Sequence, residues 1–98
     1  MSYVDTLAEE VRSKIPKDLL PDGDTIPLFR LYALLALTKG AEVTAADVHD
    51  AWAVWMSSTD PQHPALRPFT ELSPEKRQED QVFVDAIRDV AAQNPWIR

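Results

Sequence analysis

Eight prolines and only two glycines punctuate the 98-residue chain, and the prolines separate four stretches in which apolar residues recur every three or four positions. That spacing gathers apolar side chains on one face of an α-helix. Proline ends a helix because it lacks the amide proton that the helix interior needs. No stretch alternates apolar and polar residues for more than a few positions, so no substantial sheet is expected. The sequence predicts an all-α fold, a compact four-helix domain with a proline-pinned loop (residues 59–70) between the third and fourth helices.

The first two predicted helices cover residues 3–14 and 27–39. The second is apolar on almost every side, which is typical of a central helix surrounded by others. Asp24 or Thr25 is expected to cap its start. Gly40 follows its last turn, where a glycine lets the chain adopt a left-handed conformation.

The last two predicted helices have recognisable starts. Thr44 and Asp47 form a variant of the capping box, in which side chain and backbone bond each other reciprocally. That third helix is expected to end near Ser57. The fourth begins after Ser73, with Pro74 in its first turn, and carries one apolar face as far as Val90.

We expect a single domain over residues 1–98. It comprises an N-terminal helical pair (1–42), a second region (43–92) and a short tail (93–98). Trp96 lies in the tail and is expected to cover the helix ends. If exposed, it is a candidate for contact with a partner.

Composition excludes several classes of function. The chain has 10 basic and 16 acidic residues, a net charge of -6, which argues against nucleic acid and anionic membranes as partners. The absence of cysteine excludes disulfides, thiolate nucleophiles and cysteine-ligated zinc. Asp5, Glu9 and Glu10 stand where a secretory signal would be basic and then apolar. The longest apolar stretch, residues 31–37, is too short for a membrane span. A cytoplasmic location is expected.

No enzyme chemistry is predicted. His49 and His63 are the histidines of the chain, and neither lies in a nucleophile elbow, a metal-binding helix or a phosphate loop. Together with Asp50 and Asp60 they would suffice for a metal on paper, but their spacing matches no known site. We therefore expect no catalytic residue, no metal and no cofactor. Nucleotide hydrolysis with His49 or His63 as the base is a distant alternative.

The aromatic residues suggest a ligand site instead. Trp52 and Trp55 lie about one turn apart on the third helix. If the proline-pinned loop folds back over this helix, aromatic rings and a guanidinium converge, which suits a purine base and its phosphates. The alternative, that both tryptophans belong simply to the core, stays open. The predicted ligand-binding residues are His49, Trp52, Trp55, His63, Arg67, Phe69 and Arg77.

An acidic domain repels polyphosphates at long range, so a nucleotide site here needs a local basic patch. Arg67 and Arg77, with Lys76 beside the loop, are the residues that could supply it.

Two strings in this region resemble the ryanodine-receptor repeat (RyR) domain. Residues 48–53 read VHDAWA and residues 63–69 read HPALRPF, followed by Leu72. The family shows a His-x-x-Trp-Ala helix, a loop reading His-Pro-x-Leu-x-Pro-aromatic, and then a leucine that leads into a helix. Asp80 and Arg77 match an aspartate and a preceding basic residue of that helix. The chain lacks the family's Gly-Trp-x-Tyr-Gly-like turn between the two strings.

The resemblance covers residues 43–92 and implies a small helical binding module for adenine nucleotides or related signals. Since the family's bacterial and phage relatives look like parts of nucleotide-signalling and defence systems, it implies a sensor subunit or a phage-encoded sponge. The chain also looks like the short accessory proteins of actinobacterial phages. The alternative from a different class is a protein-interaction module, most simply a homodimer, that uses the apolar second helix or the Trp96 tail.

Overall fold

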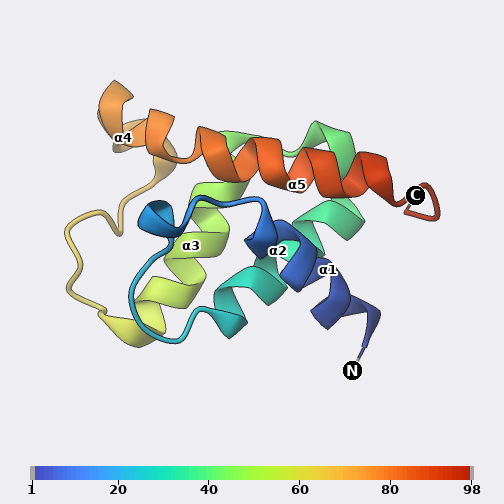
Figure 1. Cartoon of the computed structure of the whole chain (residues 1–98). Helices are drawn as coiled ribbons and strands as arrows, with labels where there is room; N and C mark the ends of the chain where they lie inside the picture. The colour runs from blue at the N-terminus through green and yellow to red at the C-terminus, as the bar shows by residue number, and fades with distance from the viewer. Residues whose placement is uncertain (1, 98) are drawn as a thin grey trace.

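The computed structural model describes residues 2–97 and confirms the all-α prediction. Four helices form the body of the domain, and a short fifth helix, α4, precedes the last of them (Figure 1). No strand occurs among residues 2–97, and no helix there is long and apolar enough to cross a membrane. The helices are α1 (Tyr3–Ser13), α2 (Ile26–Thr38), α3 (Ala45–Thr59), α4 (Pro74–Glu79) and α5 (Gln81–Gln93). Single-turn 3-10 helices are η1 (Lys17–Leu19), η2 (Gly40–Glu42) and η3 (Phe69–Glu71).

Helix α2 lies at the centre of the fold, as its apolar composition predicts. It packs against α1, α3 and α5, and burial of its apolar surface against these neighbours stabilises the fold. Its charged residue Arg30 stays outside and pairs with Asp5 of α1, with Nε 3.3 Å from Oδ1. The buried residues of α2 are Leu28, Phe29, Tyr32, Ala33 and Ala36.

The ends of α2 follow the predicted signals with one refinement. Thr25 occupies the N-cap position, but its side chain makes no capping bond. Asp24 supplies it instead, since its Oδ1 accepts a hydrogen bond from the amide of Ile26 at 3.1 Å. At the other end Gly40 has φ +57°, the left-handed conformation that glycine adopts without steric cost.

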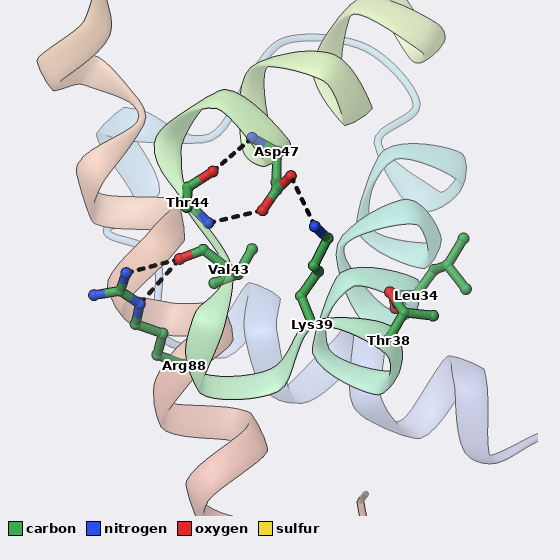
Figure 2. A network of polar contacts seen from close by, with 7 residues as sticks. All are labelled: Leu34, Thr38, Lys39, Val43, Thr44, Asp47 and Arg88. Carbon is green, nitrogen blue, oxygen red and sulfur yellow. Dashed lines mark hydrogen bonds and ion pairs between the residues drawn. The ribbon is translucent and has the colours of Figure 1, made fainter.

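A polar network joins the end of α2 to the start of α3 (Figure 2). The predicted capping box is present, with Thr44 and Asp47 exchanging bonds of 2.9 and 3.2 Å. The Lys39 ammonium lies 3.7 Å from the Asp47 carboxylate. From α5, Arg88 donates two hydrogen bonds to the carbonyl of Val43, at 3.1 and 2.8 Å. This network fixes the start of α3, the helix that carries the predicted site.

Two predicted helix boundaries were wrong. Helix α3 extends to Thr59, beyond Ser57. The predicted fourth helix is divided at Asp80 into α4 and α5, because the bonds there tighten to i→i+3 spacing. The amide of Asp80 bonds the Arg77 carbonyl at 3.3 Å, and the amide of Phe83 bonds the Asp80 carbonyl at 3.1 Å. Asp80 therefore lies at a bend, with its side chain free of any capping bond to α5.

The start of α1 and the tail after α5 lie on the same side of the molecule (Figure 1). Trp96 is 58% exposed, which contradicts the expectation that it covers the helix ends. Its indole N–H donates to Oδ1 of Asn94 at 3.2 Å. Its ring stands edge-on to the exposed ring of Tyr3, with centroids 6.0 Å apart.

Candidate functional site

A pocket of about 490 Å³ opens between the connector after α1, the loop that joins α3 to α4, and the bend between α4 and α5. Helices α2 and α3 form its inner side. Its lining residues are Asp18, Leu19, Pro21, Tyr32, His49, Trp52, His63, Ala65, Leu72, Lys76, Gln78, Glu79, Asp80, Val82 and Phe83.

Aromatic rings from α3 and the following loop form one wall of this pocket. The rings of His49 and Trp52 stack with centroids 5.6 Å apart and planes 25° from parallel. His63 of the loop stands edge-on to Trp52, at 5.0 Å and 82°. Phe69 tilts against His49 at 6.2 Å but does not itself line the pocket. The α3–α4 loop therefore folds back over α3 and brings the predicted histidines and Trp52 together.

Hydrogen bonds fix the orientation of both histidines. His49 is buried, and its Nε2 lies 2.6 Å from the carbonyl oxygen of Arg67. Because a carbonyl only accepts, the proton of neutral His49 is assigned to Nε2. The Nδ1 of His63 accepts the amide proton of Ala65 at 3.0 Å, which assigns the proton of neutral His63 to Nε2. The loop is thus pinned by ring nitrogens as well as by prolines.

Tyr32 and Asp80 line the inner end of the pocket, and the pKa values of both side chains are raised. Tyr32 is only 1% exposed, and burial, together with the nearby charge of Asp80, raises the pKa of its hydroxyl. Burial also raises the pKa of Asp80 to about 6. The charge of His49 opposes that rise, and the charge of Glu79 adds to it. Perturbed pKa values in a pocket are a frequent feature of functional sites.

Four of the predicted site residues lie outside the pocket lining. Trp55 is 7% exposed and packs into the core, where its indole N–H donates to the Asp24 carbonyl at 3.1 Å. Trp55 therefore belongs to the hydrophobic core, which was the alternative to its role in ligand binding. Arg67 is exposed and contributes its carbonyl to His49. The Arg77 guanidinium lies 5.2 Å from the centre of the Phe69 ring and donates to the carbonyl of Thr70 at 2.7 Å.

The predicted site residues include neither Tyr32 nor Asp80. Tyr32 lies among leucines and alanines in α2, so the sequence pattern predicts only a core position for it. The signal that could have found it is its hydroxyl, a polar group within an apolar helix that needs a polar neighbour. Among residues 2–97 no group of three histidine, aspartate or glutamate side chains is arranged to hold a metal ion.

A second hollow, of about 520 Å³, lies between α1 and the start of α2. It is lined by neither a histidine nor a tryptophan, and its charged residues include the ion pair of half-buried Asp5 with exposed Arg30. The first pocket is therefore the better candidate, because it combines aromatic walls with a few convergent polar groups.

A family model described as "Domain of unknown function (DUF7701)" matches residues 2–92, a span that includes every residue lining the first pocket. No curated protein and no solved structure matches the chain.

Proposed function

The chain belongs to the family of the domain of unknown function DUF7701, and on that premise we propose that it is a non-enzymatic binding module for a small flat ligand. The ligand class that the pocket suits is a nitrogen heterocycle of the adenine type. The resemblance to the RyR repeat at residues 48–53 and 63–69 supports the same class of ligand. The biological role that this resemblance suggests for such a module is a sensor subunit or a phage-encoded sponge.

The observation that carries this proposal is the position of Trp52. Its half-buried ring is held between His49 and His63 and lines a pocket of about 490 Å³. Small-molecule sites are typically clefts of about 300–1,000 Å³ with aromatic walls and a few polar groups. A ring that is already ordered loses little entropy when a base packs against it.

The polar groups at the inner end suit the edge of a base. The Asp80 carboxylate accepts hydrogen bonds, and an exocyclic amino group on a heterocycle donates them. The Tyr32 hydroxyl can do either. Lys76 is the cation among the lining residues. Arg67 and Arg77 are directed elsewhere, so in a nucleotide the base would occupy the pocket and the phosphates would lie at its mouth.

The indole N–H signals of the three tryptophans test the proposal by NMR. Adenosine, AMP and ADP-ribose are titrated into the ¹⁵N-labelled protein. We expect the Trp52 signal to shift in a saturable way. The Trp55 and Trp96 signals serve as internal controls because neither residue lines the pocket. Unchanged Trp52 signals at millimolar concentrations of all three ligands refute the proposal.

A matched pair of variants separates stacking from nonspecific effects. Trp52→Ala is expected to weaken adenosine binding by about fivefold to 150-fold, since stacking of a base on an aromatic side chain contributes about 1–3 kcal/mol. Trp96→Ala removes an equally large ring at the far end of the chain. It is expected to leave the affinity unchanged.

A protein-interaction role is the second candidate, and one observation favours it. Tyr3 and Trp96 form an exposed aromatic pair, 61% and 58% accessible, where the ends of the chain meet. Aromatic residues are enriched in the energetic centres of protein interfaces. Light scattering at concentrations on the order of tens of micromolar tests for a homodimer, which Trp96→Ala should dissociate. A monomer under these conditions removes the homodimer.

A further inference from the structure

We infer that the pocket selects flat ligands whose edge carries a positive charge and N–H donors, such as an amidinium group, over the same ring with an anionic edge. Asp80 is the carboxylate that receives this edge. The inference rests on the proposed function, because it specifies the charge of the ligand that the same pocket binds.

The charges around the pocket carry the first part of the argument. Asp18, Glu79 and Asp80 line it, against a single ammonium from Lys76. That ammonium lies 3.7 Å from the Glu79 carboxylate in an exposed pair, so Glu79 offsets much of its charge. An anion that enters meets net negative charge at short range, within a chain whose own net charge is -6.

The arginines do not reverse this balance. The sequence suggests Arg67 and Arg77 as the residues that meet a phosphate. The structure places the Arg77 guanidinium over Phe69 and against the Thr70 carbonyl. Arg67 holds His49 through its backbone, and its side chain does not line the pocket.

The carboxylate of Asp80 makes neither a capping bond nor an ion pair among residues 2–97. It stands at the N-cap position of α5, where an aspartate ordinarily bonds the first amides, yet its side chain makes no capping bond. It forms no ion pair among residues 2–97. A half-buried carboxylate that is paired with no lysine or arginine side chain gains more from a bound cation than a solvated carboxylate does, because desolvation has already weakened its hydration.

Tyr32 is an independent second observation at the same end of the pocket. Its side chain is more than nine-tenths buried and lines the pocket, and burial, with the charge of Asp80 adding to it, raises the pKa of its hydroxyl. The neutral hydroxyl is therefore a polar group that can bond a donor-rich ligand edge beside the carboxylate.

Proton linkage follows from this arrangement. The titratable and charged groups around Asp80 are Tyr32 from α2, His49 from α3, Lys76 and Glu79 from α4, His63 from the α3–α4 loop and Asp18 from η1. A cation binds the ionised form of Asp80. Its affinity therefore falls as the pH drops through about 6, where Asp80 takes up its proton, by up to about tenfold per pH unit.

Three small probes that share a phenyl ring test the charge preference: benzamidine as a cation, benzamide as a neutral molecule and benzoate as an anion. Each is titrated into the full chain at pH ~7.5, and binding is followed by the Trp52 indole signal. We expect benzamidine to bind about tenfold or more tightly than benzamide, since hydrogen bonds to charged groups are roughly twice as strong as neutral ones. Benzoate is expected to bind most weakly.

Variants assign the preference to Asp80. Asp80→Asn should reduce benzamidine affinity to the level of benzamide and abolish its pH dependence. Asp89→Asn, an exposed carboxylate on α5 outside the pocket, is the matched control and should change neither. Benzoate binding as tightly as benzamidine overturns the inference, as does a preference that survives in Asp80→Asn.

The two proposals fail in distinguishable ways. Adenosine binding without any benzamidine binding overturns the charge inference and keeps the proposed function. If neither adenosine nor any of the three probes shifts the Trp52 signal, both are refuted.

Discussion

The imidazole Nε2 of His49 and the backbone carbonyl oxygen of Arg67 lie 2.6 Å apart, although eighteen positions separate them in the chain. This bond ties the α3–α4 loop to α3 at the point where the pocket wall begins. Because the ring of His49 also stacks on Trp52, one side chain both anchors the loop and supports the aromatic wall. Stability of the loop and shape of the pocket therefore depend on the same residue.

Replacing His49 tests this dual role. His49→Leu fills the buried position with an apolar side chain but leaves the Arg67 carbonyl without its donor. We expect the free energy of unfolding to fall by about 1–3 kcal/mol, the usual cost of an unsatisfied buried polar group. Urea denaturation measures it. Asp50→Ala, at the exposed neighbouring position, is the control and should stay within about 0.5 kcal/mol of the unmodified protein. An equal loss in both variants contradicts the anchoring role.

Asp80 makes stability depend on pH in a predictable direction. Its folded-state pKa of about 6 lies above the ordinary value of 3.8, so the folded protein holds this proton more tightly than the unfolded chain. The resulting stabilisation is complete below pH 3.8 and is lost as the pH rises through about 6. Asp80→Asn removes that loss. We expect the variant to gain stability over the unmodified protein at pH ~7.5 and to gain much less at pH ~4.

Urea midpoints at the two pH values check this difference, and other carboxylates cancel because they are common to both proteins. An NMR titration of the Asp80 carboxyl carbon gives the folded-state midpoint directly. A midpoint near the ordinary value, with equal stability differences at both pH values, would show that Asp80 is solvated.

The helix starts and the central position of α2 could be predicted because their signals are local. Thr44 with Asp47, Ser73 with Pro74, and Gly40 each specify a cap from adjacent residues. The division at Asp80 could not be predicted in this way. Residues 74–93 carry no glycine and no proline after Pro74 that would mark a break, and the bend depends on how the tertiary packing places α4 beside the loop, a property that local propensity does not encode.

The site was predictable only in part, for a related reason. His49, Trp52 and His63 came together because the prolines direct the loop back over α3. Helical spacing indicates the pocket wall and the core equally well for Trp52 and Trp55. Tertiary contacts distinguish them, since the indole N–H of Trp55 donates to the Asp24 carbonyl in the connector before α2. Tyr32 and Asp80 come from other helices, and their approach to α3 depends on the packing of α2, α4 and α5.

The capping box supplies a prediction on the fold alone. Thr44→Ala removes the hydroxyl that accepts from the Asp47 amide and should cost about 0.5–2 kcal/mol of unfolding free energy. Thr38→Ala is the matched control, since the Thr38 hydroxyl bonds the Leu34 carbonyl of its own helix on an exposed face and Ala has the higher helix propensity. A larger loss at Thr38 than at Thr44 contradicts the assignment of the cap.

Substitutions of the two tryptophans of α3 should have different effects, one mainly on the free energy of unfolding and the other mainly on ligand affinity. Trp55→Phe removes the hydrogen bond to Asp24 and leaves a cavity in the core, so we expect a loss of about 1–3 kcal/mol in unfolding free energy. Trp52→Phe affects a half-buried ring and should cost less stability, but it shrinks the pocket wall and should weaken adenosine binding. Urea denaturation and the adenosine titration, carried out on both variants, check the two effects. If Trp55→Phe weakens binding at full stability while Trp52→Phe does not, the pocket wall has been assigned to the wrong tryptophan, since only a ring that lines the pocket can act on the ligand without acting on the fold.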